Sequence, residues 1–381
     1  MTFGRAIRGA FRLEADVAYL NHGSFGAVPR PVLAEVASWR ERMEAEPVRF
    51  FMREAPAALI QARMALARFL NAEPEGLGFV ENATAGVNAI LASIDWRAGD
   101  EIVTTSHVYN AVRNAARHWA GRFGARLIEA PVPFPVDGPD AVVGAIEAAL
   151  GPHTRLLMVD HITSPTALVF PVDRLVALAR RHGVPILVDG AHAPGMLPLD
   201  VRAVGADWYV GNCHKWLFGA RGCAFVYAAA ERRGALHPPV ISHGYGQGMA
   251  REFDWVGTRD LAPWLALPAA LSFVAEHGLD RIATHNRALI ADATAMIEQR
   301  WGVQAGAPPA MRPFMAALPM PAAGPATPER AVALHDHLFD RYKIEVPVMA
   351  FAGTLWARIS AQIYNERDDY RRLAEAAWPA A

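Results

Sequence analysis

The feature that most constrains the fold is a regular alternation of short apolar runs with amphipathic segments of helical period, which begins near residue 77. This alternation is typical of a mainly parallel sheet covered by helices on both faces. Ligands of such sheets collect at the carboxyl ends of the strands, so residues that follow the apolar runs are the first candidates for a site. The pattern predicts strands at 77–81, 101–105, 155–160, 185–189, 207–210 and 223–227, and helices at 85–94, through 113–119, and at 172–182.

The pattern changes beyond about residue 262. We expect helices at 262–277 and 281–301, a Pro/Gly/Ala-rich stretch at 306–328, a helix at 331–341, strands at 344–348 and 355–360, and a terminal helix from residue 366. A chain of 381 residues exceeds the size at which one core keeps growing. We therefore expect a large α/β domain at 20–275 and a small α+β domain at 276–381, with residues 1–19 packed against the small domain.

Charge and cysteine content favour a small-molecule partner. The net charge of −1 and the lack of a basic block argue against nucleic-acid binding and a polybasic membrane anchor. Cys213 and Cys223, the chain's two cysteines, cannot supply a disulfide framework or a four-thiolate zinc site. No run is long enough to span a membrane, and the first residues lack the apolar segment of a secretory signal. We expect a soluble cytoplasmic protein, and the spacing of its 14 histidines predicts no metal site.

Lysine is rare in this chain. Of 37 basic residues only Lys215 and Lys343 are lysines, and Lys215 lies in a half-apolar run between His214 and Trp216. An amine can lose its proton and form an imine, which a guanidinium cannot do. Enclosure would lower the pKa of Lys215 toward the range in which an amine is nucleophilic. An accidental lysine on a solvated face is the alternative, and it describes Lys343 better.

Three further segments follow predicted strands. The turn that contains Thr84 offers backbone N–H groups to a phosphate at a helix N-terminus, although threonine is also a common helix cap. Asp189 ends a buried strand, where a carboxylate needs a cation such as a protonated pyridine nitrogen, or else caps a helix. Asn212 and His214, just before Lys215, offer donors to a phosphate or a ring.

An arginine interrupts the last predicted strand. Arg358 shares a strand face with Trp356 and Ser360 in an otherwise apolar run. This placement favours bidentate binding of a carboxylate, and a buried structural ion pair is the alternative.

In combination these segments resemble the class V aminotransferase group of pyridoxal-phosphate enzymes, which have fold type I. The resemblance covers nearly the whole chain, and its isopenicillin N epimerase-like branch is the most similar. It implies a large domain with a mainly parallel seven-stranded sheet, a small α+β domain, pyridoxal 5'-phosphate as cofactor, an amino-acid substrate, and a homodimer with active sites at the subunit interface. The motifs that carry it are Tyr19–Gly26, His161–Ala167, Gly211–Trp216 and Asp254–Asp260, together with Thr84, Asp189 and Arg358.

The resemblance also implies roles for individual residues. Lys215 would hold the cofactor as an imine and move the Cα proton, and Asp189 would keep the pyridine nitrogen protonated. Tyr109 matches a tyrosine used as an acid in some relatives, and His22 is a second candidate for that acid. The implied contacts are Ala83, Thr84, Asn212 and His214 to the phosphate, Thr258 from the neighbouring subunit, His107 stacked on the ring, Ser164 and His192 near the ring hydroxyl, and Arg358 with Asn21 at the substrate carboxylate.

Several reactions remain open at this stage. The resemblance favours epimerase or β-lyase chemistry through an external aldimine and a Cα carbanion; transamination to a keto acid and a noncatalytic binding protein of this fold are alternatives. A desulfurase that uses a late cysteine is disfavoured, because no cysteine follows Cys223. A dinucleotide-binding module is disfavoured too, because the turn at 82–86 lacks the Gly-x-Gly-x-x-Gly spacing. Asn212 and Ser164 depart from the residues common in the group. Arg49, Arg53, His243 and Tyr245 are candidates for the substrate pocket or for the subunit interface.

Overall fold

A seven-stranded sheet forms the centre of the protein. The structure, a computed structural model, describes residues 2–321 and 324–378. The strand order is β2-β8-β7-β6-β5-β3-β4, and β8 alone runs against the other six. The predicted mainly parallel seven-stranded sheet is therefore confirmed. The strands are β2 (Leu77–Val80), β3 (Glu101–Thr105), β4 (Arg126–Ala130), β5 (Thr154–Asp160), β6 (Ile186–Asp189), β7 (Trp208–Asn212) and β8 (Ala224–Ala228).

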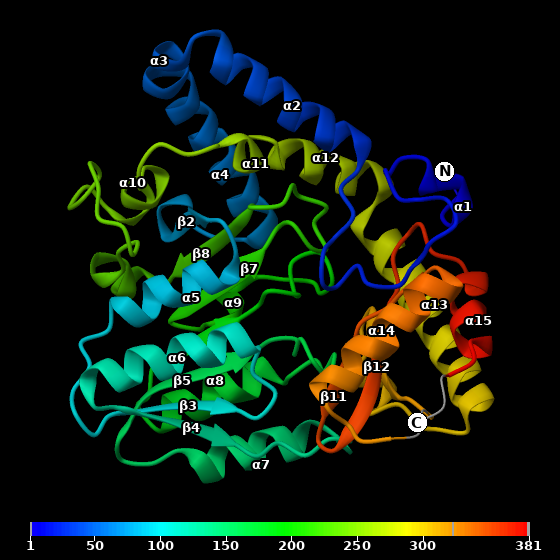
Figure 1. The fold of residues 1–381 in the computed structure, drawn as a ribbon. Helices are drawn as coiled ribbons and strands as arrows, with labels where there is room; N and C mark the ends of the chain where they lie inside the picture. Colours follow the sequence, from blue (N-terminus) through cyan, green and yellow to red (C-terminus); the bar gives the residue numbers. More distant parts are fainter. Residues whose placement is uncertain (1, 322–323, 379–381) are drawn as a thin grey trace.

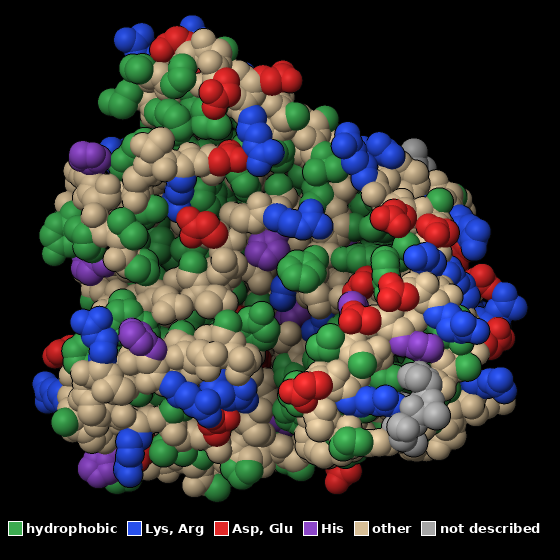
Figure 2. Space-filling view, viewed as in Figure 1, with side chains coloured by type: hydrophobic (Ala, Val, Ile, Leu, Met, Phe, Trp, Pro, Cys, Tyr) green, Lys and Arg blue, Asp and Glu red, His purple; other side chains and the backbone are tan. Residues whose placement is uncertain are grey.

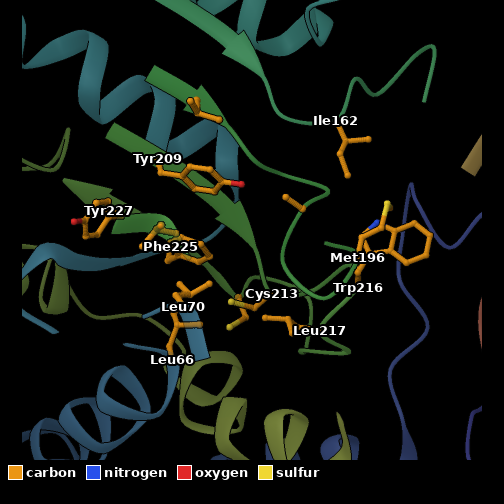
Figure 3. Close-up of a cluster of buried hydrophobic side chains, with 14 of the residues drawn as sticks. Leu66, Leu70, Ile162, Met196, Tyr209, Cys213, Trp216, Leu217, Phe225 and Tyr227 are labelled. Carbon is orange, nitrogen blue, oxygen red and sulfur yellow. The ribbon is translucent and has the colours of Figure 1, made fainter. Parts of the chain in front are cut away.

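Helices cover both faces of this sheet (Figure 1). Successive residues of a strand point to opposite faces, so Leu187 packs in one hydrophobic cluster with α5 and α6 while Val188 packs in another with α4, α7 and α8. Figure 3 shows the second cluster, where Leu66 and Leu70 of α4 lie beside Phe225. The covering helices are α4 (Ala55–Leu70), α5 (Ala83–Ala92), α6 (Asn110–Phe123), α7 (Pro139–Ala149), α8 (Val172–Arg181), α9 (Val201–Val204) and α10 (Met249–Asp254).

Further helices and helical turns connect or flank this layer. They are α1 (Arg5–Arg8), α2 (Arg30–Ala45), α3 (Pro47–Arg49), the π-helical turn η1 (Phe50–Glu54), and the 3₁₀ turns η2 (Pro74–Gly76), η3 (Ala230–Ala235) and η4 (Pro309–Met311). None of the described helices combines the length and the hydropathy that crossing a bilayer requires.

The last third of the chain builds two further sheets and a separate core. Strands β11 (Val348–Phe351), β12 (Thr354–Ser360) and β9 (Met315–Pro319) form an antiparallel sheet in that order, while β10 (Ile344–Glu345) pairs in parallel with β1 (Ala18–Tyr19). Leu318, Leu334 and Ile359 belong to a hydrophobic cluster distinct from those of the large sheet. The helices around it are α13 (Leu279–Trp301), α14 (Pro328–Tyr342) and α15 (Arg367–Glu375).

Three elements differ from the sequence-based expectation. The helix expected at 262–277 is two helices, α11 (Ala262–Leu265) and α12 (Leu267–His277), because Pro268 lies in the first turn of α12, where its missing N–H costs nothing. The strand expected at 344–348 is divided between β10 and β11, and Pro347 lies between the two. The Pro/Gly/Ala-rich stretch at 306–328 contains strand β9, whose apolar run is short and ends in proline.

Edge strand β4 was not predicted. Its residues Arg126 to Ala130 are mostly half-buried, and the run includes Arg126 and Glu129. An edge strand with one open side needs no continuous apolar run, so periodicity does not mark it.

Candidate active site

A cavity of about 640 Å³ lies at the carboxyl edge of the large sheet. It is lined by Asp160, Asp189 and Asn212, which end the adjacent strands β5, β6 and β7. The N-terminus of α5, the segment 24–26 and the loop around Lys215 complete its wall. In Figure 2 the middle of the visible face is hollowed, and histidine and basic side chains gather there. This is the edge at which a mainly parallel sheet binds its ligands.

Lys215 presents its amine to this cavity. Its Nζ lies 3.0 Å from Nε2 of His192. Burial, followed by the positive charge of Arg358, lowers the pKa of Lys215 from 10.5 to about 7, while Asp189 and Asp160 act in the opposite direction. A large fraction of the amine is therefore neutral near pH 7, as a nucleophilic lysine requires.

The segment around Gly26 holds the backbone of Lys215 in place. A Cβ at Gly26 would lie 2.6 Å from the carbonyl oxygens of both His214 and Lys215, so only glycine permits this crossing. His22, four residues earlier, contacts the Lys215 carbonyl through Nε2 at 3.0 Å and Tyr364 through Nδ1 at 2.7 Å. Burial lowers the pKa of His22 to about 3. His22 is thus a neutral, fully hydrogen-bonded group behind the lysine, and it does not line the cavity.

Two buried carboxyl groups lie side by side at the strand ends. Asp160 and Asp189 are register partners on β5 and β6 and are 3% and 4% exposed. Burial raises the pKa of Asp189. The N–H of Ala191 donates to its Oδ1 at 2.9 Å, and this hydrogen bond acts in the opposite direction. Burial and then the charge of Asp189 raise the pKa of Asp160 well above its usual range. A cation placed next to Asp189 would relieve this cost, and a protonated pyridine nitrogen is such a cation.

The N-terminus of α5 retains few free donors. The N–H of Ala83 donates to Oδ1 of Asn212 at 2.8 Å, and Asn82 caps the helix by accepting from the N–H of Ala85 at 2.9 Å. The N–H and hydroxyl of Thr84, and Nδ2 of Asn212, are among the donors that remain for a phosphate at this helix end. The Ala83 N–H predicted for the phosphate is already occupied by Asn212.

Two histidines in the cavity wall are neutral. His214 contacts the Cys223 carbonyl through Nδ1 at 3.0 Å, and burial followed by the charge of Lys215 lowers its pKa to about 4. The same two causes lower the pKa of His192 well below its usual range. Nδ1 of His192 accepts from Nε1 of Trp216 at 3.4 Å, which fixes the ring beside the amine.

Arg358 lies behind the cavity wall. Strand β12 buries it to 2% exposure, and its Nη1 donates to the Ser164 carbonyl at 2.5 Å while Nη2 donates to Oγ of Ser24 at 2.7 Å and to Oδ1 of Asn21 at 3.5 Å. Its Nε has no partner among the described residues. Burial lowers the pKa of Arg358 to about 10, so the guanidinium remains charged at pH 7. Ser24 and Ser164 both line the cavity, so this cation lies directly behind its surface.

Two predicted contacts lie outside the cavity. His107 is fully buried among aromatic rings, 4.8 Å from the ring centre of Phe351, with Nδ1 on Thr166 at 2.7 Å and Nε2 on the Val132 carbonyl at 3.1 Å. The aromatic residue that this segment contributes to the cavity is Tyr109, which is 47% exposed. His107 and Tyr109 are two residues apart on an irregular turn, so sequence position alone did not show which of their side chains enters the cavity. Thr258 is exposed on the loop after α10 and does not line the cavity of its own chain.

Sequence reasoning missed several residues that line the cavity, among them the charged Asp160 and Arg221. Asp160 had a usable signal, because it ends an apolar strand just as Asp189 does. Arg221 is exposed in the loop after Lys215, and nothing in its local pattern distinguishes it from the other surface arginines.

The residues present fit pyridoxal 5'-phosphate. Lys215 supplies an amine for an imine, Asp189 is a buried carboxylate that needs a cation, and Thr84 with Asn212 offers donors for a phosphate. These are the three requirements of a phosphorylated pyridine aldehyde, and they meet in one cavity.

Comparisons with known proteins agree with this arrangement. The family described as aminotransferase class-V matches residues 18–336. Isopenicillin N epimerase of Amycolatopsis lactamdurans is 38% identical, over 96% of this chain and 95% of its own length. A probable chloroplastic L-cysteine desulfhydrase of Arabidopsis thaliana is 33% identical, over 95% of this chain and 82% of its own.

A solved structure shares the fold. A lysine-to-alanine mutant of the cystine C-S lyase C-DES, with glycine covalently linked to its PLP cofactor, superposes with a TM-score of 0.83 and 23% identity, covering 96% of this chain and 97% of that one. The predicted fold type I and the predicted cofactor are confirmed. The chain belongs to the class-V aminotransferase family of pyridoxal-phosphate-dependent enzymes and, within it, is similar to the isopenicillin N epimerases.

Proposed function

We propose that this enzyme catalyses β-elimination from an amino acid that carries a sulfur substituent on Cβ. The Cα–H and Cβ–S bonds break, and one water is consumed. The products are a thiol, pyruvate and ammonia, so no oxidant or reductant is needed. When bound, pyridoxal phosphate supplies an electron-accepting ring that makes the Cα proton removable; the other roles belong to the chain's own residues.

The observation that carries the proposal is the buried amine of Lys215. A general base works best when its pKa lies near the working pH, and the pKa of this amine is about 7. In the described part of the chain it is the one lysine that lines the cavity, so it is positioned both to bind the cofactor aldehyde and to move a proton at Cα. His192, 3.0 Å away, holds the amine in position.

The other predicted residues have supporting roles. Asp189 would hold the pyridine nitrogen protonated, and Thr84, Asn212 and His214 would hold the phosphate. Arg358 would bind the substrate carboxylate at the surface formed by Ser24 and Ser164, with Asn21 behind it. Ser164 and His192 would face the ring hydroxyl, and the aromatic face of Tyr109 would cover the ring in place of His107.

Elimination is favoured over transfer of sulfur to the protein. A persulfide requires an accessible thiol, whereas Cys213 and Cys223 are both fully buried in the core. Burial also raises the pKa of Cys223 well above its usual range, which suppresses the reactive thiolate. Relatives named L-cysteine desulfhydrase, at up to 33% identity, support elimination.

Epimerisation is the second candidate. It needs an acid on the side of Cα opposite Lys215, and the phenol of Tyr109 is the exposed acidic group that the wall offers near Arg358. The similarity to isopenicillin N epimerases supports this candidate. Transamination would differ from both by consuming a keto acid.

One experiment separates these reactions. The purified enzyme is incubated with a panel of amino acids in deuterated water, with and without a keto acid. Pyruvate and thiol release from cysteine derivatives supports elimination. Deuterium at Cα with inverted configuration and no pyruvate would instead establish epimerisation, and amino-group transfer that depends on a keto acid would establish transamination. A cofactor band that no amino acid shifts would leave a noncatalytic binding protein.

We also propose a homodimer in which Thr258 faces the partner's cavity. Large apolar side chains are exposed over α3, η1 and the loop before α10, where Val48, Met52, Ile241 and Tyr245 are 57–73% exposed. Figure 2 shows hydrophobic side chains gathered over the α3 end of the molecule. Exposed apolar patches of this kind mark interfaces. Arg49, Arg53 and His243 lie in the same segments. Light scattering tests the assembly, and a monomeric mass would contradict it.

The remaining assignments are proposals of the same kind. The separate hydrophobic cluster of the last third and the pairing of β1 with β10 support domains at 20–275 and 276–381, with residues 1–19 on the smaller one. The two free cysteines support a reducing cytoplasm. Limited proteolysis and localisation of a tagged protein test these two proposals.

A further inference from the structure

A second cleft adjoins the cofactor cavity. It has a volume of about 460 Å³ and lies between α14, β11 and the start of α6. Tyr109 and Ser164 line both spaces, and Ser164 accepts from Arg358, the proposed carboxylate anchor. A substrate held by its carboxylate at Arg358 therefore has this cleft next to it.

The cleft is apolar where the cavity is charged. Its walls are formed by Val332 on α14 and by Val348, Met349 and Phe351 on β11. Val332 is 59% exposed, so the apolar surface is open to solvent. Removing such surface from water contributes about 25 cal/mol per Å², which favours an apolar ligand over a polar one.

The charge at the rim is already compensated. Among the described residues that line the cleft, Arg113 alone carries a full charge. Its Nε donates to Glu129 at 3.0 Å and its Nη2 to the Ser106 carbonyl at 3.0 Å. An anionic side chain would have to compete with Glu129, so the cleft does not select for one.

The size of the cleft exceeds what a free thiol needs. Small-molecule sites are about 300–1,000 Å³, and this cleft of about 460 Å³ is an addition to the cavity that would hold the cofactor. An apolar cavity of about 150 Å³ already binds benzene, so the cleft has ample room for a substituent of the size of an aromatic ring.

We propose that this cleft receives the part of the substrate beyond Cβ, and that the enzyme acts best on S-conjugates of cysteine whose sulfur carries an apolar alkyl or aryl group. The proposal rests on the proposed elimination and names its substrate class. Val332, Met349 and Phe351 are then specificity-determining residues.

Turnover of two substrates tests this. Elimination from S-benzyl-L-cysteine and from L-cysteine breaks the same Cβ–S bond and releases pyruvate, but only the first has an apolar group to place in the cleft. We expect kcat/KM to be at least about tenfold higher for the first, since one methylene in an apolar pocket discriminates about 10- to 200-fold. Val332→Asp should lower the ratio of the two kcat/KM values about tenfold. Ala333→Asp is the matched control, because it adds the same charge at the next exposed position of α14, outside the cleft.

The outcomes separate the two proposals. Calorimetry on the cofactor-loaded protein compares L-alanine with L-2-amino-5-phenylpentanoate, in which a methylene replaces sulfur and nothing can leave. If the phenyl compound binds more tightly than L-alanine and Val332→Asp weakens that binding, the cleft assignment is supported. Absence of pyruvate from every substrate would overturn the proposed elimination but not the cleft assignment. Equal binding of both compounds, or an equal effect of the two Asp variants, would overturn the cleft assignment. The proposed elimination would still stand if pyruvate were released. A change of oligomeric mass in Val332→Asp alone would assign the cleft to a subunit contact and overturn the proposal.

Discussion

Charged cavities lie at the amino edge of the seven-stranded sheet, where its parallel strands begin, and at the carboxyl edge, where they end. The two cavities differ in how their charges are compensated. Strand β6 starts beside a cleft of about 490 Å³ at the amino edge and ends at the cofactor cavity at the carboxyl edge. At the amino edge Glu73 pairs with Arg202 and Arg233 at 3.1 and 3.0 Å, and Asp207 pairs with Arg232 at 2.7 Å.

At the carboxyl edge Glu81 pairs with Arg259, but the buried groups of the cavity have no such partner in the described part of the chain. Asp160, Asp189 and Lys215 are buried there without a direct ion pair among the described residues, and their pKa values move toward the neutral forms. The amino edge instead lowers the pKa of Glu73, chiefly through a backbone hydrogen bond. Exposed pairs add little stability, whereas uncompensated buried charges cost free energy and persist where a ligand will compensate them. Burial and the lack of a compensating partner, and not the number of charges, therefore identify the site.

The largest expected effect follows removal of the Lys215 amine. Lys215→Ala should abolish covalent capture of pyridoxal phosphate and lower turnover by at least about 10³-fold, because the chain would lose its proposed nucleophile and its proposed general base together. Borohydride reduction followed by mass spectrometry measures the capture. Lys343→Ala is the control, and label retained in Lys215→Ala would refute the assignment.

Asp189→Asn tests whether the carboxylate compensates a cation. A hydrogen bond to a charged group contributes about 1.5–3 kcal/mol, so cofactor affinity should fall about 10- to 100-fold. Fluorescence titration of the apoprotein with pyridoxal phosphate measures it. Asp207→Asn at the other edge is the comparison, and equal losses in both variants would erase the distinction between the edges.

The pKa of Lys215 sets a pH dependence. The neutral amine reacts, and the pKa is lowered to about 7. The rate of cofactor capture by the apoprotein should therefore level off above about pH 7 and fall about tenfold for each pH unit below it. Stopped-flow absorbance across this range gives the profile. A rate that keeps rising to pH 10 would mean an ordinary lysine.

Tyr109→Phe separates the two roles of this side chain. The variant keeps the aromatic face and removes the acid, so elimination should change by less than about tenfold while inversion at Cα should fall by at least about 100-fold, as loss of a general acid predicts. Pyruvate release and Cα configuration are measured on the same sample. Unchanged inversion would exclude Tyr109 as the acid.

The smallest effect belongs to the amino edge. Arg232→Ala removes a pair whose arginine side chain is 38% exposed, and such pairs are worth about 0–1 kcal/mol. The free energy of unfolding, measured with denaturant, should fall by no more than this amount. Cofactor capture should be unaltered. Impaired capture would give the amino edge a functional role that its pairing does not suggest.

Local sequence determined much of this protein. The alternation of apolar and amphipathic segments predicted the parallel sheet, because periodicity records which face of each element is buried. Lys215 and Asp189 were singled out from the sequence, since an amine in a half-apolar run and a carboxylate at a strand end are costly without a partner, and both line the cavity. Edge strand β4 and strand β9 escaped, because one carries charges and the other is a short run among Pro, Gly and Ala.

Only the tertiary structure decided which side chains share the cavity. It brings Asp160 beside Asp189, directs Tyr109 into the cavity and buries His107 among Phe134, Phe170 and Phe351. It also places β11 and α14 next to the start of α6, although more than 200 residues separate them in the chain. These contacts depend on strand register and on the packing of segments that are far apart in the chain. A local sequence pattern records the burial of its own residues, and it does not record which distant residues lie beside them.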